Sequence, residues 1–415
     1  MRYIQHIKTC LAVCIICCLF QGCFKDTVRH TYTLYYPVYK SISEVRANIS
    51  SSSATSIQNP GKLFIYGNYV FLNEVNKGIH IIDNTNPESP VNKYFINIPG
   101  NLDVAVKGNI LYADLFSDLV TIDISNPSHI QVKKVTEKVF PYRQYANGFS
   151  PDSTKIIVDW VQKDTTVIED LSPTIWSQQT GIYTLASQDR AASLVSPTVG
   201  IAGSMARFAL FGNYLYAVTE QALNVFDITN AEQPAFTNKV NIGFGIETIY
   251  PFKNNLFIGS RNGIFAYSVT NPAQPVRSGV FTHATSCDPV IADDNYAFVT
   301  LRAGTACGGQ INQVDVLNIQ NIQNPVLVKS FPLSNPYGLS KDGNTLFICD
   351  GTAGLKVYDA SNVANLRLLQ TITGLNTYDV IATNNLALVV TKDGLYQFDY
   401  STPSKLKFLS KVSYN

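Results

Sequence analysis

Acidic residues at the starts of strand-like runs are the groups in this chain that could do chemistry. Asp103, Glu247 and Asp288 each stand at or just before an apolar, strand-like run. Two carboxyl groups at a suitable separation can cleave a glycosidic bond, one as general acid and the other as base or nucleophile. These three acids are therefore the candidates for the active site of a carbohydrate-active hydrolase or lyase.

The sequence carries no motif of another enzyme class. No CxxC pair occurs outside the N-terminal leader, and the 415 residues contain no GxSxG, HExxH, P-loop or dinucleotide fingerprint. None of the five histidines has the spacing of a metal ligand, and they are His6, His30, His80, His129 and His283. The net charge is +1 and no block of lysines and arginines accumulates, which argues against nucleic acid. We predict no metal and no cofactor.

Three cysteines lie outside the N-terminal leader. Cys287 and Cys307 fall within one repeat unit, so they could form a disulfide outside the cytoplasm, and two unpaired thiols are the equal alternative. Cys349 lies in the apolar run that contains Leu346-Phe347-Ile348 and predicts a buried small side chain.

An aspartate recurs at the end of similar apolar runs, as in Leu119-Val120-Thr121-Ile122-Asp123. Repeated metal or ligand contacts are one interpretation. The other is that each aspartate accepts hydrogen bonds from backbone N–H groups of the following turn. The regular recurrence favours this structural role, which we assign to Asp83, Asp123, Asp227, Asp359 and Asp399.

The repeats predict an all-β fold. Units of four strand-like runs occupy residues 60–99, 100–140, 141–200, 201–243, 244–284, 285–334, 335–374 and 375–415. A four-stranded antiparallel sheet in every unit is the pattern of a β-propeller blade. The count favours eight blades, and seven would follow if the interrupted third unit, 141–200, were not a complete blade. An open solenoid is the alternative, but neither end looks like a polar capping repeat.

The repeated strand resembles a known family. Leu-Val-x-x-Asp-Ile-Ser-Asn-Pro at residues 119–127 is similar to the LVIVD repeat, and residues 59–84 look like the opening of LVIVD-repeat lipoproteins of Bacteroidetes. The resemblance covers residues 31–415. It implies a propeller on a lipid anchor and implies no agreed activity.

The N-terminus has the pattern of a targeting segment. Arg2 and Lys8 precede an apolar run from Cys10 to Phe20 that is too short to span a bilayer. Gln21-Gly22-Cys23 then resembles a bacterial lipobox, although Phe20 replaces the usual leucine. We expect a signal peptide at 1–22, lipidation of Cys23, an anchor and lead-in linker at 23–58 and the propeller at 59–415. An ordinary signal peptide or an uncleaved anchor remains the alternative.

The lead-in should contain some structure of its own. Residues 31–36 predict a strand, residues 41–49 a short helix with Ser43 as its cap, and residues 50–56 a linker. The short segment Phe24-Lys25-Asp26 partly resembles the export signal of surface lipoproteins. We therefore expect an outer-membrane lipoprotein on the cell surface or the periplasmic face.

Residues that differ from unit to unit are the candidates for binding. Links into each first strand converge on one face of a propeller, and two longer insertions, 160–181 and 302–310, are expected on the same face. A solvated pore rim is the alternative for these positions. The candidate residues are Lys62, Asp103, Asn147, Trp160, Trp176, Arg207, Glu247, Asp288, Arg302, Tyr337 and Asp379.

Two functions follow from these patterns. The first is a lipid-anchored, non-enzymatic binding or scaffold protein of the cell envelope, with exposed tryptophans stacking on a sugar or anchoring a protein partner. The second is the carbohydrate-active enzyme, with Asp103, Glu247 and Asp288 at the mouth of the channel.

Overall fold

The computed structural model describes residues 27–143, 154–170, 201–283, 289–304 and 309–414. The chain divides into two compact units. One comprises Met1–Lys40 with Gln144–Gln188, and the other comprises Ser41–Arg143 with Asp189–Asn415. Among the described residues, no helix has the length and apolar character needed to cross a membrane.

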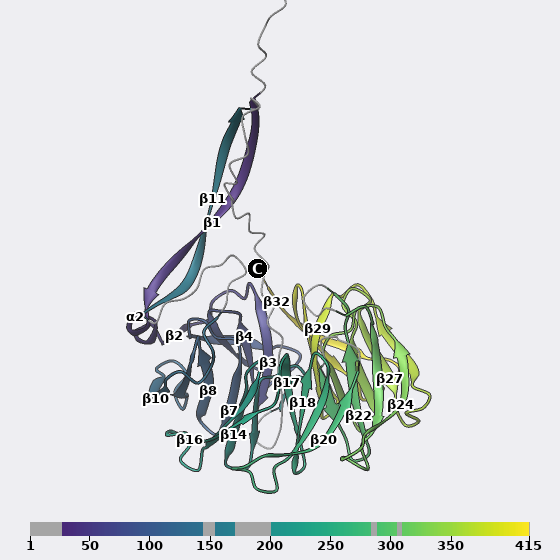
Figure 1. Cartoon of the computed structure of the whole chain (residues 1–415). Coiled ribbons are helices and arrows are strands. Elements are labelled where there is room, and N and C mark those ends of the chain that lie inside the picture. Colours follow the sequence, from purple (N-terminus) through teal and green to yellow (C-terminus); the bar gives the residue numbers. More distant parts are fainter. Residues whose placement is uncertain (1–26, 144–153, 171–200, 284–288, 305–308, 415) are drawn as a thin grey trace, which may run out of the picture. The chain divides into compact units, whose positions relative to one another are not determined.

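The described part of the first unit forms a two-stranded ribbon (Figure 1) made of β1 (Thr27–Ser41) and β11 (Lys155–Asp170). Thr31 and Thr166 share a hydrogen bond between their hydroxyls, Thr33 donates to Asp164, and Gln162 donates to Tyr35. From one hydrogen-bonded pair to the next, the residue number rises by two in β1 and decreases by two in β11, so the two strands are antiparallel.

The second unit is a propeller of seven blades, each a four-stranded antiparallel meander with its first strand innermost. We number the blades in chain order. Blades 1 and 2 contain β3 (Pro60–Tyr66), β4 (Tyr69–Glu74), β5 (Gly78–Asp83), β6 (Val91–Asn97), β7 (Val104–Lys107), β8 (Ile110–Leu115), β9 (Asp118–Asp123) and β10 (Gln131–Thr136). Blades 3 and 4 contain β13 (Phe208–Phe211), β14 (Tyr214–Val218), β15 (Ala222–Asp227), β16 (Ala235–Asn241), β17 (Ile246–Phe252), β18 (Asn255–Ser260), β19 (Gly263–Ser268) and β20 (Val276–Thr282).

The remaining three blades follow the same plan. Blade 5 contains β21 (Val290–Ala292), β22 (Tyr296–Leu301), β23 (Gln313–Asn318) and β24 (Val326–Pro332). Blades 6 and 7 contain β25 (Leu339–Asp342), β26 (Thr345–Cys349), β27 (Leu355–Asp359), β28 (Arg367–Ile372), β29 (Thr377–Thr383), β30 (Leu386–Thr391), β31 (Gly394–Asp399) and β32 (Lys407–Ser413).

The prediction of eight blades was wrong, because the unit at 141–200 is not a blade. Its described residues, 141–143 and 154–170, contain one strand, the 16-residue β11, which pairs with β1 and with no strand of a blade. Residues 155–170 contain no glycine, asparagine or proline that could reverse the chain within the run. With no glycine, asparagine or proline at which to reverse, the run continues as one strand and pairs with the 15-residue β1.

The core lies between adjacent blades, not within one central cluster. Phe298 of blade 5 packs with Leu346 and Tyr358 of blade 6, and Phe347 of blade 6 packs with Val389 and Phe398 of blade 7. The second and third strands are covered on both sides by neighbouring sheets and are almost entirely buried. The fourth strands face solvent and alternate in exposure.

Each fourth strand carries a β-bulge at the same place, near its start. In blade 2, for example, Val132 pairs with Ile122 whereas Lys134 pairs with Thr121. A bulge twists an edge strand and interrupts its ladder, which opposes edge-to-edge association. The bulge in each repeat therefore opposes pairing of its outer strand with a strand of another molecule.

Blade 1 is a six-stranded sheet because two further strands join it. β2 (Ser50–Ser53) pairs with the outer strand β6, and β12 (Ile201–Ala202) pairs with the inner strand β3. The stretch expected as a linker thus contains a strand. α2 (Ile42–Ala47) precedes β2, and its N-cap is Ser41, two residues before the expected cap, with Glu44 completing a capping box.

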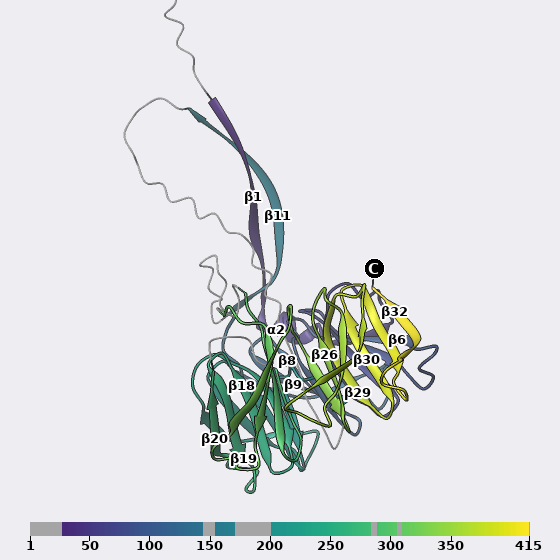
Figure 2. The same cartoon turned by 90° about the vertical axis from the view of Figure 1, so that its right-hand side faces the viewer.

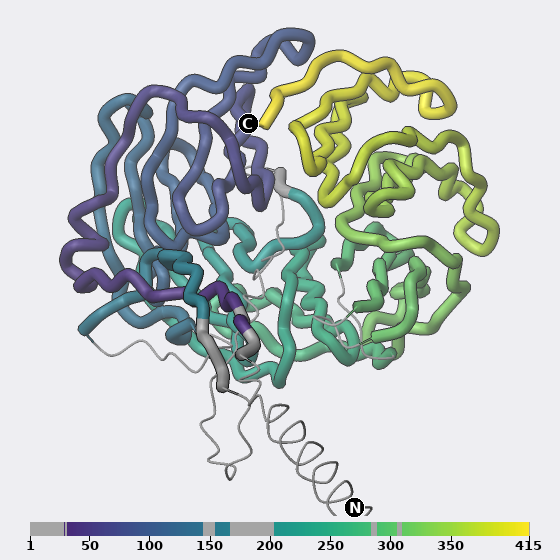
Figure 3. Tube along the Cα trace, turned by 90° about the horizontal axis from the view of Figure 1, so that it is seen from above, coloured from purple at the N-terminus to yellow at the C-terminus, as the bar shows by residue number. Residues whose placement is uncertain are grey.

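The ring closes between blade 7 and blade 1 without exchanging a strand. Seen from above, the last blade in yellow lies beside the first in blue (Figure 3). Asn84 and Gln397 donate their amides to each other at 2.9 and 2.6 Å, and the hydroxyl of Ser410 donates to the carbonyl of Pro87. Side-chain contacts therefore hold this seam. Figure 2 shows the same sheets turned by 90°.

Candidate functional site

The segment 203–206, which continues from β12, crosses the space enclosed by the inner strands. The Gly203 N–H donates to Leu63 O of blade 1, Leu339 N of blade 6 donates to Ser204 Oγ at 2.8 Å, and Ile249 N of blade 4 donates to Ala206 O at 2.6 Å. Ser204, Met205 and Ala206 are all buried. Because these partners lie on different sides of the ring, the segment fills its centre at this level.

A buried ion pair lies beside this segment and joins blades 1 and 2. Lys62 Nζ donates to Asp103 Oδ2 at 2.9 Å, and the same oxygen accepts the backbone N–H of Arg207 at 2.7 Å. Burial lowers the pKa of Lys62 because it disfavours the charged ammonium, whereas Asp103 opposes that effect. The ammonium of Lys62 and the carboxylate of Asp103 are therefore each other's charged partners.

Asp379 is a further buried acidic residue beside this segment. A Cβ atom on Gly203 or Gly338 would lie 1.9 or 2.1 Å from its carboxylate oxygens, so glycine is required at both positions. Desolvation by burial raises the pKa of Asp379 to about 7, although the N–H of Val380 and the charge of Lys62 act in the opposite direction. The carboxyl group is enclosed by the chain's own backbone.

Of the three proposed catalytic acids, the structure describes Asp103 and Glu247, and it gives them separate partners. Asp103 is in the buried ion pair, Glu247 accepts a hydrogen bond from Arg261 Nε at 3.1 Å near the surface, and Asp288 lies outside the described residues. No group of three or more His, Cys, Asp or Glu side chains that could hold a metal ion occurs in the described part of the chain. Within the part of the chain that the structure describes, Asp103 and Glu247 therefore do not form a carboxylate pair open to a substrate.

Aromatic and amide side chains from three consecutive blades meet on the face where the inner strands begin. The guanidinium carbon of Arg302, after β22, lies 4.1 Å from the ring centroid of Tyr337, and that ring meets Tyr378 edge to face at 5.4 Å. Asn335 and Asn376 donate their amides to the hydroxyls of Tyr337 and Tyr378 at 3.4 and 3.2 Å. All five residues are partly exposed. We call them the Arg302 cluster.

Sequence reasoning identified Arg302 and Tyr337 but missed the other members. The signal was a repeated Asn-x-Tyr, Asn335-Pro336-Tyr337 and Asn376-Thr377-Tyr378, at the entry to two consecutive blades. Phe244 was missed as well. It is 79% exposed in the link between β16 and β17 on this same face, between Gly243 and Gly245.

The other predicted positions divide between the two units. Trp160 lies in β11 of the ribbon, so the expectation that it belongs to a blade was wrong. Cys349 is buried and unpaired in β26, and burial raises the pKa of its thiol. Outside the described residues lie Cys23, Asn147, Trp176, Asp288, Cys287 and Cys307.

The recurring aspartates lie in the turns between third and fourth strands. The carboxylates of Asp83, Asp123, Asp227, Asp359 and Asp399 each accept the N–H of the residue two positions on, at 2.7–2.9 Å. The asparagine that follows repeats the pattern, as where Asn126 accepts from Ser128 N at 3.2 Å. These are Asx turns.

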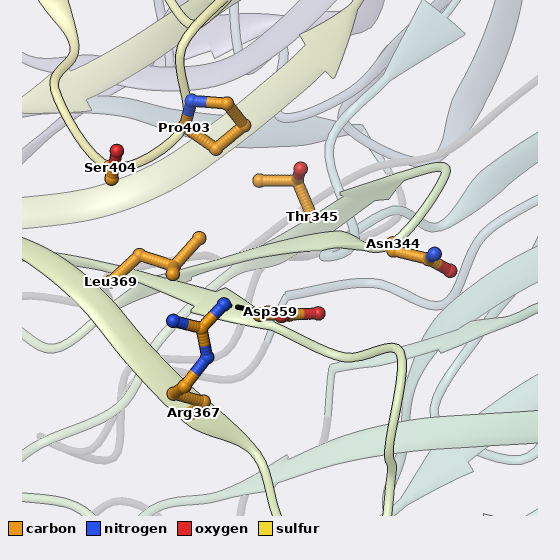
Figure 4. A pocket seen from close by; sticks show the side chains of 7 residues that line it. All are labelled: Asn344, Thr345, Asp359, Arg367, Leu369, Pro403 and Ser404. Carbon is orange, nitrogen blue, oxygen red and sulfur yellow. Dashed lines mark hydrogen bonds and ion pairs between the residues drawn. The ribbon is translucent and has the colours of Figure 1, made fainter.

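A shallow depression of about 360 Å³ lies between blades 6 and 7, lined by Asn344, Thr345, Asp359, Arg367, Leu369, Pro403 and Ser404 (Figure 4). Arg367 donates to Asp359 at 2.8 Å across it. Hydrogen bonds from the Arg367 and Ser361 side chains and the Ser361 N–H lower the pKa of Asp359 to about 2. A turn aspartate and its ion-pair partner are therefore part of the lining of this depression.

A family model for the LVIVD repeat matches residues 61–96, 101–136 and 202–242, which correspond to blades 1, 2 and 3. The chain therefore contains LVIVD repeats and is a β-propeller repeat protein. No curated protein matches the sequence.

Several solved structures share the fold at low identity. A protein from Lactobacillus plantarum is 12% identical with a TM-score of 0.53, over 86% of this chain and 97% of that chain. The computationally designed Ika8 protein is 10% identical with a TM-score of 0.52, over 87% and 89%. The periplasmic gluconolactonase PpgL of Pseudomonas aeruginosa is 13% identical with a TM-score of 0.51, over 85% and 96%. These likenesses concern the fold alone.

Proposed function

We propose that this protein is a lipid-anchored propeller of the cell envelope that binds a glycan or protein partner and is not an enzyme. The face on which the inner strands begin is the binding surface. The observation that carries the proposal is the filled centre of the ring, where the buried segment 203–206 and the Lys62–Asp103 pair occupy the space that a catalytic pocket would need.

The same face offers groups suited to recognition. Phe244 projects from a link between two glycines and is the most exposed large hydrophobic residue of the described chain. Arg302 and its tyrosines supply charge, ring faces and hydroxyls in one place. Exposed aromatic residues and arginine are the types that dominate the energy of protein interfaces.

The N-terminal sequence supports the anchor. A positive start, a short apolar run and Gly22-Cys23 resemble the leader of bacterial lipoproteins, and the repeats resemble those of LVIVD lipoproteins of Bacteroidetes. We propose an outer-membrane lipoprotein, on the cell surface or facing the periplasm. Lipid on Cys23 would keep the propeller at the membrane while its face remains free to bind.

Binding is tested by placing a photoreactive residue at position 244, on the proposed face, or at position 236, which is 55% exposed on the outer strand β16. Both full-length variants are irradiated in cells, and purified protein is applied to a glycan array. We expect adducts or glycan retention that depend on position 244 and not on 236. Absence of both glycan retention and a face-specific adduct would overturn the proposal.

The anchor is tested with Cys23→Ser. We expect labelled fatty acid to enter the wild-type protein and not the variant, and the variant to leave the membrane fraction. Protease accessibility in intact cells then separates the cell surface from the periplasmic face. Unchanged membrane retention of the variant would contradict lipidation at this residue.

A further inference from the structure

Two arginines occupy equivalent places on the proposed binding face. Arg261 directly follows the second strand of blade 4, which ends at Ser260, and Arg302 directly follows that of blade 5, which ends at Leu301. Arg261 Nε donates to Glu247 at 3.1 Å. Arg302, in contrast, makes no ion pair or hydrogen bond through its guanidinium to any described residue, and lies over the Tyr337 ring instead.

The Tyr337 ring is fixed by its surroundings. Its backbone N–H donates to Cys349 O at 2.7 Å, its carbonyl accepts from Thr300 Oγ1 at 2.7 Å, and its hydroxyl accepts from Asn335. Gly338 N donates to Tyr378 O at 2.9 Å, which ties the two tyrosines of neighbouring blades together. The cluster is thus held by rigid strand ends, which limits the entropy lost when a ligand binds.

The chemistry of the cluster is specific. A guanidinium that lies over a ring can still direct two N–H groups to a bidentate carboxylate. Partly exposed tyrosine rings offer apolar faces with a polar tip, which suits the C–H face and hydroxyls of a sugar. The amides of Asn335 and Asn376 have oxygen atoms that can accept from hydroxyls. A carboxylate on a sugar ring satisfies all three requirements at once.

We propose that the Arg302 cluster is a binding site for an acidic glycan, with a uronic-acid carboxylate on Arg302 and sugar rings against Tyr337 and Tyr378. The assignment rests on the proposed binding function and names the ligand class of that face.

The test is calorimetric titration of the full-length protein in detergent with a uronic-acid oligosaccharide and with its carboxyl-reduced, neutral form. We expect the acidic form to bind and the neutral form to bind at least about tenfold more weakly. Arg302→Gln should lower affinity for the acidic form by roughly tenfold or more and leave the neutral form unchanged. Arg261→Gln is the matched control and should bind like wild type.

Three outcomes would overturn the assignment. They are an unchanged affinity in Arg302→Gln, an equal loss in Arg261→Gln, which would indicate diffuse positive charge, and equal competition by inorganic phosphate, which would indicate a simple anion site. Tyr337→Ala should weaken both oligosaccharides, whereas Tyr337→Phe keeps the ring and controls for misfolding. If the acidic glycan fails while position 244 still yields face-specific adducts, only the ligand class is wrong.

Discussion

Lys62 Nζ lies 2.9 Å from Asp103 Oδ2 inside the ring of blades, where the two side chains are 1% and 2% exposed. The pair joins the inner strands of blades 1 and 2, and Asp103 also accepts the backbone N–H of Arg207 from blade 3. One carboxylate thus connects three blades at the centre of the propeller.

Breaking this pair should be costly. Lys62→Met leaves a buried carboxylate without its counter-charge, for which about 3–5 kcal/mol of unfolding free energy is lost. Urea unfolding of the full-length protein measures the change. Replacing both partners with apolar residues should cost less than the single change, and a single variant as stable as the wild type would contradict the interaction.

The seam between blades 7 and 1 should depend on the reciprocal amides of Asn84 and Gln397. Gln397→Ala removes two hydrogen bonds across the closure, and we expect it to lower the unfolding free energy by about 1–2 kcal/mol. Asn84→Ala should cost a similar amount, and the double variant should cost less than the sum of the two. Strict additivity would show that the amides do not interact in solution.

The turn aspartates should tolerate asparagine but not alanine. Asn318 occupies the equivalent place in blade 5 and accepts from Gln320 N at 3.0 Å, so an amide oxygen can do the same work. We expect Asp123→Ala to lose about 1 kcal/mol and Asp123→Asn to lose less. Thermal unfolding of the two variants side by side distinguishes them, and equal losses would argue against the Asx turn.

For Asp123 we also predict that its contribution to stability depends on pH in the acidic range. Hydrogen bonds from the Ser125 backbone N–H and hydroxyl lower the pKa of Asp123 in the folded protein. Its contribution to stability is therefore complete above the unfolded pKa of about 3.9 and is lost as the pH falls through the lowered native value. The difference in stability between wild type and Asp123→Ala should shrink in that acidic range. A constant difference would contradict this linkage.

For Asp379 we predict that stability depends on pH with the opposite sign. Its pKa is raised to about 7 in the folded protein, against about 3.9 when unfolded, so the native state holds the extra proton between these values. Stability from this group is then lost as the pH rises from about 4 to about 7. Asp379→Asn removes the titration, so its stability relative to the wild type should rise as the pH increases from about 4 to about 7 and then stay constant. Parallel pH profiles of the two proteins would refute the buried, protonated carboxyl.

Local sequence patterns predicted much of the fold and part of the candidate site. Four runs per unit, turn glycines such as Gly108 (φ 60°) and the recurring aspartates identify a propeller blade, because those signals depend on residues close in sequence. Tyr337 could be named because strand starts are visible in the sequence, and Arg302 because it begins the insertion at 302–310. The contact between them could not, since it joins two separate blades.

The sequence by itself thus determined the repeat, the four-stranded blade and the turn chemistry, since each depends on alternation and hydrogen bonds between near neighbours. Only the tertiary structure decided the number of blades, because β11 has an unforeseen partner, β1, more than 100 residues away. It also decided which charges remain available. In the sequence, Lys62, Asp103 and Arg302 all differ from the residues at equivalent positions of other repeats. In the structure, Lys62 and Asp103 are buried and pair with each other, whereas Arg302 is partly exposed.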